Sequence, residues 1–126
     1  MTDTELKEMI MTSMGNGLLE NLIDMFKEDP SLIRFIPDMI KTNNLRIKIG
    51  VIALVQEIGK NPRNELEQIV PPLIDLLKNN DPVLKGDVAY ILSILKSPSS
   101  LPALKSLCND ENPDVREIAL EALEDY

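Results

Sequence analysis

Few residues in this chain of 126 could act as nucleophiles or as acid–base catalysts near neutral pH. The sequence contains no histidine and a single cysteine, Cys108. It therefore lacks imidazole bases and Ser-His or Cys-His pairs, and one thiol cannot form an internal disulfide or a thiolate zinc site. We expect Cys108, which ends a short apolar segment, to be a buried small side chain in a reducing compartment.

Phosphate-binding and carboxylate chemistry also lack their usual patterns. The five glycines are scattered, so no glycine-rich phosphate loop can be identified. Acidic residues alternate with apolar ones, as on the solvated face of amphipathic helices, and no calcium-loop motif is present. The sequence therefore predicts no catalytic residue, no metal site and no cofactor.

Charge is distributed unevenly along the chain. The 21 acidic and 13 basic residues give a net charge of −8, which favours a basic partner over nucleic acid or anionic lipid. Residues 1–30 carry −5, 31–60 carry +3, 61–96 carry −1 and 97–126 carry −5. The middle segment predicts either a binding patch for an acidic partner or an ordinary solvated surface. The candidate partner-binding residues are Arg34, Lys41, Arg46 and Lys48, with Arg34 and Lys41 expected on one helix face.

Helical periodicity is almost continuous and predicts an all-α protein of about eight short helices. Capping residues and prolines delimit them, beginning with a capping box at Thr2 and Glu5. Pro71 and Pro72 should kink or split the fifth helix. The fourth helix is apolar around most of its circumference and should be buried on several sides. The expected helices start near residues 2, 19, 30, 45, 64, 82, 98 and 113.

An internal repeat is visible in the second half of the chain. An offset of 31 superposes Pro71 on Pro102 and Asn79 on Asp110. The same offset brings Leu84 onto Val115, Lys85 onto Arg116, Val88 onto Ala119 and Leu92 onto Leu123. A more divergent copy places Leu45 and Arg46 under Leu84 and Lys85, at an offset of 39.

From about Pro30 to Leu123 the chain resembles HEAT-repeat proteins, of the short-repeat type also found in phycobilisome lyase subunits. Its clearest stretch is NDENPDVREIALEAL near the C-terminus. The resemblance implies paired antiparallel helices, with a proline in the first helix, an aspartate in the turn and a basic residue in the second. The structural repeat positions are Pro71, Asn79, Lys85, Pro102, Asp110, Val115 and Arg116. In the divergent copy Pro37 and Arg46 match, but no acidic residue precedes Arg46.

The resemblance implies a single domain that forms a right-handed α-α superhelix. Residues 1–29 would be an N-terminal helical cap, followed by a divergent repeat at 30–60 and repeats at 61–96 and 97–126. End units of a solenoid must shield its apolar core. Arg46, Lys85 and Arg116 would hydrogen-bond turn residues between units rather than bind a ligand.

The function that follows is that of a non-catalytic, cytoplasmic protein-binding scaffold or adaptor, acting through the groove that the second helices line. Two alternatives remain open: an accessory subunit or chaperone of a lyase-type enzyme, and weak nucleic-acid binding through the central basic patch. We expect no membrane partner and a monomer or weak oligomer. The N-terminus carries acidic residues where a secretory signal would be basic, and no apolar run is long enough to span a membrane.

Overall fold

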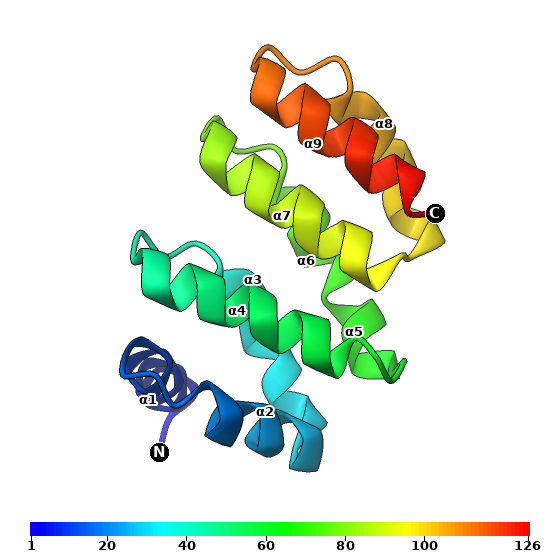
Figure 1. Ribbon diagram of the computed structural model, residues 1–126. Coiled ribbons are helices and arrows are strands. Elements are labelled where there is room, and N and C mark those ends of the chain that lie inside the picture. Colours follow the sequence, from blue (N-terminus) through cyan, green and yellow to red (C-terminus); the bar gives the residue numbers. More distant parts are fainter. The chain divides into compact units, whose positions relative to one another are not determined.

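The computed structural model describes all 126 residues, which form helices joined by short turns, without any strand. The all-α fold expected from helical periodicity is therefore confirmed. The chain divides into two compact units, Met1–Glu65 and Leu66–Tyr126, and each is described by itself (Figure 1).

The first unit is built around one long helix, α4, which contacts the three α-helices that precede it. The capping box predicted at its N-terminus is confirmed: Glu5 N donates to Thr2 Oγ1 and Thr2 N donates to Glu5 Oε1, both at 3.1 Å. The elements are α1 (Asp3–Gly15), α2 (Leu19–Glu28), the 3-10 helix η1 (Pro30–Phe35), α3 (Ile36–Met39) and α4 (Leu45–Ile58).

The single third helix expected from Pro30 onward is wrong. Asp29 caps this segment by accepting a hydrogen bond from Ser31 N at 3.2 Å, but the next six residues form a 3-10 helix. Ile36 N donates to Ile33 O, three residues back. Pro37 has no N–H to donate to that carbonyl from four residues away, so the α-helical pattern cannot pass through this point.

The expectation that α4 is buried on several sides agrees with its contacts with α1, α2 and α3, but one face of the helix is exposed. Leu45 is 69% exposed and Ile49 is 60% exposed, four residues apart on one face. Ile47, Val51 and Leu54 are buried. The helix is therefore amphipathic in the ordinary way, with two aliphatic side chains on its solvent face.

Close contact between α1 and α4 depends on a glycine. A Cβ atom added to Gly50 would lie 2.3 Å from Met14 Sδ and 2.5 Å from Met14 Cγ. Met14 is 2% exposed, so its side chain has little space into which to move. Glycine lowers the helix propensity of α4 at this position, but the absence of a Cβ lets the Met14 thioether pack directly against the α4 backbone.

The second unit consists of two helical hairpins. Figure 1 shows α7 and α9 side by side and running in the same direction, with α6 and α8 behind them. The split expected at Pro71 and Pro72 is confirmed, because a short helix α5 (Asn64–Gln68), which spans the division between units, ends just before them. The other elements are α6 (Val70–Leu76), α7 (Pro82–Leu95), η2 (Pro98–Ser100), α8 (Leu101–Leu107) and α9 (Pro113–Glu124).

The end of α9 is held against the preceding hairpin by Tyr126. Its Oη donates to Leu92 O at 3.2 Å and also hydrogen-bonds Ser100 Oγ. Burial raises the pKa of the Tyr126 phenol. This contact joins the last turn of the chain to the last turn of α7, in a unit whose buried side chains are mainly aliphatic.

Replacing Gly50 with Ala should destabilise the protein although alanine is the better helix former. Overpacking against Met14 costs about 1–3 kcal/mol, whereas the gain in helix propensity is about 1 kcal/mol. We expect a lower urea midpoint by far-UV circular dichroism. Gly86→Ala is the matched control, because its added Cβ meets only the mobile end of Ile118 at 2.9 Å and should be close to neutral. Equal effects of the two substitutions would contradict the assigned role of Met14.

Replacing Lys96 with Gly should stabilise the protein. Lys96 ends α7 in the left-handed conformation, with φ 53° and ψ 32°, which disfavours residues that have a Cβ. We expect the free energy of unfolding to rise by about 0.5–1 kcal/mol. Lys96→Ala removes the charge but keeps the Cβ, so a gain in Tm from that variant would show that charge, and not backbone conformation, is responsible.

Candidate functional site: the groove between α7 and α9

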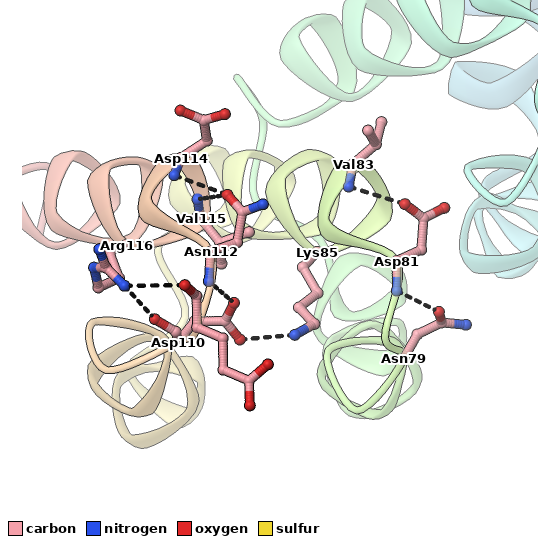
Figure 2. A network of polar contacts seen from close by, with 10 residues as sticks. Asn79, Asp81, Val83, Lys85, Asp110, Asn112, Asp114, Val115 and Arg116 are labelled. Atoms are coloured by element: carbon pink, nitrogen blue, oxygen red, sulfur yellow. Dashed lines mark hydrogen bonds and ion pairs between the residues drawn. The ribbon is translucent and has the colours of Figure 1, made fainter.

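The turns that lead into α7 and α9 share one hydrogen-bond pattern (Figure 2). In the first turn, Asn79 Oδ1 accepts from Asp81 N at 2.9 Å, and Asp81 Oδ1 accepts from Val83 N at 3.0 Å. The second turn repeats this at an offset of 31. Asp110 Oδ2 accepts from Asn112 N at 3.1 Å, and Asn112 Oδ1 accepts from Asp114 N at 2.8 Å. Side-chain acceptors therefore cap the N-termini of α7 and α9 in the same way.

Lys85 on α7 connects these two turns (Figure 2). Its Nζ donates to Asp110 Oδ1 at 2.7 Å, and the two side chains are only 15% and 13% exposed. The hydrogen bond from Lys85, together with that from the Asn112 backbone, lowers the pKa of Asp110. The ion pair therefore holds the start of α9 against the first turns of α7.

Arg116, which aligns with Lys85, binds its own turn. Its Nη1 donates to Asp110 O at 2.8 Å and to Glu111 O at 3.2 Å. Val115 is 1% exposed, and its N–H is 3.3 Å from Asn112 Oδ1. The aligned prolines, Pro71 and Pro102, lie in the first turns of α6 and α8 and are exposed.

The alignment of the divergent copy at an offset of 39 is wrong. It matches the exposed Leu45 and Ile49 with Leu84 and Val88, which are 7% and 0% exposed. An offset of 37 matches the turns instead, since Thr42 Oγ1 accepts from Asn44 N at 3.1 Å and Asn44 Oδ1 accepts from Ile47 N at 3.1 Å. The residue equivalent to Lys85 is then Lys48 rather than Arg46.

The predicted basic patch lies in the first unit, where two of its members already have acidic partners. Arg34 Nη2 is 3.0 Å from Asp3 Oδ1, and the Arg34 guanidinium lies 4.3 Å from the centre of the Phe35 ring. Lys41 Nζ is 3.3 Å from Asp38 Oδ1. Arg34 belongs to η1 and Lys41 follows α3, so the expectation of one shared helix face is wrong.

Asp38 is the centre of this small cluster. Lys7 Nζ also approaches its carboxylate, at 3.2 Å. Burial raises the pKa of Asp38, but hydrogen bonds from Lys7 and Lys41 outweigh burial and leave that pKa below its usual value. Arg46 and Lys48, the other two patch residues, lie on α4, with Arg46 exposed and Lys48 half-buried.

A groove of about 700 Å³ lies between α7 and α9. Its helix positions follow the 3.6-residue period on both sides, so each helix presents one continuous stripe. The apolar part of the lining is formed by Pro82, Val83, Gly86, Tyr90, Ile118 and Ala122. The polar part is formed by Asp87, Ser93, Asn112, Asp114, Glu121, Glu124 and Asp125.

The groove lining contains five carboxylates and neither Lys nor Arg. Asp114, Glu121, Glu124 and Asp125 have no ion-pair partner. Three of them lie at the C-terminal end of α9, whose last turn has no basic residue. Carboxylates there oppose the helix macrodipole, and like charges four residues apart, such as Glu121 and Asp125, cost about 0.2–0.5 kcal/mol per pair. Helix stability therefore does not account for Glu121, Glu124 or Asp125.

The sequence predicted a groove lined by the second helices but not the residues that line it, because Glu121 and Glu124 read as part of an ordinary solvent face. The lining residues form one helical stripe on each helix. These stripes are positions 83, 86, 87, 90 and 93 on α7 and positions 114, 118, 121, 122 and 125 on α9. Recognising the two stripes as one groove requires knowing that α7 and α9 are neighbours. Tyr90 is 43% exposed and lines this groove.

No group of three or more His, Cys, Asp or Glu side chains is arranged to hold a metal ion. Cys108, expected to be buried, is instead half-buried, with Sγ 3.6 Å from Leu104 O. None of the helices combines the length and apolar character needed to cross a bilayer.

The stacked hairpins and their repeated capped turns define a helical-repeat protein. The family model for HEAT repeats matches residues 51–124, which is more than half of the chain, and the protein belongs to this family. Members of the family commonly serve as protein-interaction scaffolds and are generally non-catalytic. The match is to HEAT repeats in general and does not confirm the phycobilisome lyase type. A comparison with curated proteins found no match.

Replacing Asp110 with Asn should lower the melting temperature at neutral pH, because the neutral amide loses the ionic contact with Lys85. The pKa of Asp110 is lowered by folding, so this stabilisation is present above the ordinary aspartate pKa of about 4. It is lost as pH falls through the lower pKa of the folded state. We therefore expect thermal melts of variant and wild type to differ at pH 7 and to converge in strong acid.

Asp75→Asn provides the matched control. Asp75 pairs with Lys78 at 3.4 Å, but its side chain is 71% exposed, so the substitution should barely change Tm at any pH. If the difference in melting temperature between Asp110→Asn and wild type persisted unchanged to pH 2.5, an electrostatic role for the carboxylate would be contradicted.

Proposed function

We propose that this protein is a non-catalytic scaffold that binds a segment of another protein in the groove between α7 and α9. The family supports the general class of function, since HEAT repeats commonly mediate protein interactions. The groove lies on the helices that follow the repeated capped turns of the two hairpins, and repeat proteins offer extended binding surfaces of this kind.

The observation that carries the proposal is the partly apolar groove itself. A volume of about 700 Å³ is large enough to bury several side chains of a partner. Val83 is 59% exposed and Tyr90 is 43% exposed, so the α7 side of the groove offers an aliphatic and an aromatic contact to a bound chain. Tyrosine is among the residues that contribute most to the binding energy of protein interfaces, and apolar neighbours help to exclude water from around it.

Affinity purification of the tagged protein from its native cell, followed by mass spectrometry, tests the proposal. The groove variant is the double substitution Val83→Ser and Ile118→Ser, which removes apolar surface on both walls. We expect recovery of the stoichiometric partner to fall about tenfold, as loss of hot-spot contacts would produce. Circular dichroism should show that the variant remains folded.

The matched control is the double substitution Ile49→Ser and Leu120→Ser. These side chains are 60% and 56% exposed and do not line the groove, so the same loss of apolar surface should leave recovery unchanged. Equal recovery of every partner by the groove variant and wild type would sink the proposal.

A further inference from the structure

We infer that the occupant of the groove between α7 and α9 is a basic amphipathic helix of a partner protein. This inference rests on the proposed function and adds the chemistry of the partner to it. Three properties of the groove carry it: the sign of its charge, the position of that charge, and the spacing of its apolar side chains.

The sign of the charge selects a cationic partner. All five charged side chains in the lining are carboxylates, and four of them have no ion-pair partner. The segment that includes α9, residues 97–126, carries a net charge of −5. An acidic or nucleic-acid partner would be repelled here, whereas Lys and Arg side chains would be attracted and would find acceptors.

The position of the charge shows where the partner's basic residues would lie. Glu121, Glu124 and Asp125 surround the C-terminal end of α9, where helix carbonyls add further negative potential. Asp114 lies at the opposite end of the same helix. Carboxylates therefore occur at both ends of the groove, and Ile118 lies between them.

The spacing of the apolar side chains favours a helical occupant. Val83 and Tyr90 are seven residues apart on α7, which corresponds to about 10 Å along the helix axis. An amphipathic helix presents apolar side chains at the same i to i+7 spacing and keeps its flanks for basic residues. Ile118 on α9 would contact the same apolar stripe from the other wall. Helices of 14 and 12 residues can accommodate about three to four turns of a partner helix.

The first test uses a fluorescein-labelled synthetic peptide of about 14 residues, with Leu at helical a and d positions and Lys or Arg at the flanking positions. A scrambled peptide of identical composition, without an apolar face, is its control. Fluorescence anisotropy should show the amphipathic peptide binding at least about tenfold more tightly, with affinity that falls as salt increases.

The second test changes the protein while keeping the net charge of the two variants equal. The groove variant carries Glu121→Gln, Glu124→Gln and Asp125→Asn. The control variant carries three neutralising substitutions at exposed carboxylates outside the groove lining: Glu8→Gln, Glu28→Gln and Glu117→Gln. We expect the groove variant to weaken peptide binding about tenfold and the control to change it less than about twofold.

Two results would overturn the inference: equal weakening by the two triple variants, or equal affinity for the amphipathic and scrambled peptides. Mapping the segment of the native partner that binds the groove distinguishes failure of this inference from failure of the proposed function. A partner that depends on Val83 and Ile118 but binds through an acidic or uncharged segment would refute the basic helix and leave the scaffold role standing. A partner segment with a basic apolar-faced helix supports both.

Discussion

The packing of α7 against α9 is the contact on which the second unit and its groove depend. Each of these helices begins at a turn capped by its own Asx side chain, and the Lys85–Asp110 ion pair ties one turn to the other. At the far end, Tyr126 bonds Leu92 O. With both ends held, the stripe between them is preorganised, which reduces the entropy cost of binding.

The polar groups of the second unit fall into those with partners inside the protein and those that line the proposed binding groove. Polar side chains that cap turns or pair across hairpins have their hydrogen bonds satisfied within the protein, as at Asp110 and Asn112. The carboxylates at the end of α9 have no such partners and oppose the helix dipole. Glu121, Glu124 and Asp125 stabilise neither a helix nor a contact between hairpins, which is consistent with the proposed binding of an external partner. In the first unit, by contrast, the basic residues Arg34 and Lys41 are paired internally.

Glycine and proline account for the departures of the first unit from a regular repeat. Pro37 prevents a continuous α-helix and leaves a 3-10 segment in its place. Gly50 allows α4 to pack against Met14, and the face of α4 away from this contact leaves Leu45 and Ile49 exposed. The divergent copy can be recognised by its turn, through Thr42 and Asn44, more readily than by its apolar pattern.

The all-α class, most helix limits, the capping box at Thr2, the break at Pro71 and the repeat at an offset of 31 could all be predicted from the sequence. These features are local: caps, prolines and the 3.6-residue period act within one or two helical turns. Long-range packing was needed to show which side of α4 is buried, that Arg34 pairs with Asp3, and that Glu121 and Asp125 line a groove with Val83. Such pairings join residues far apart in the chain, and the helical period cannot distinguish a solvent face from a groove wall until the neighbouring helix is known.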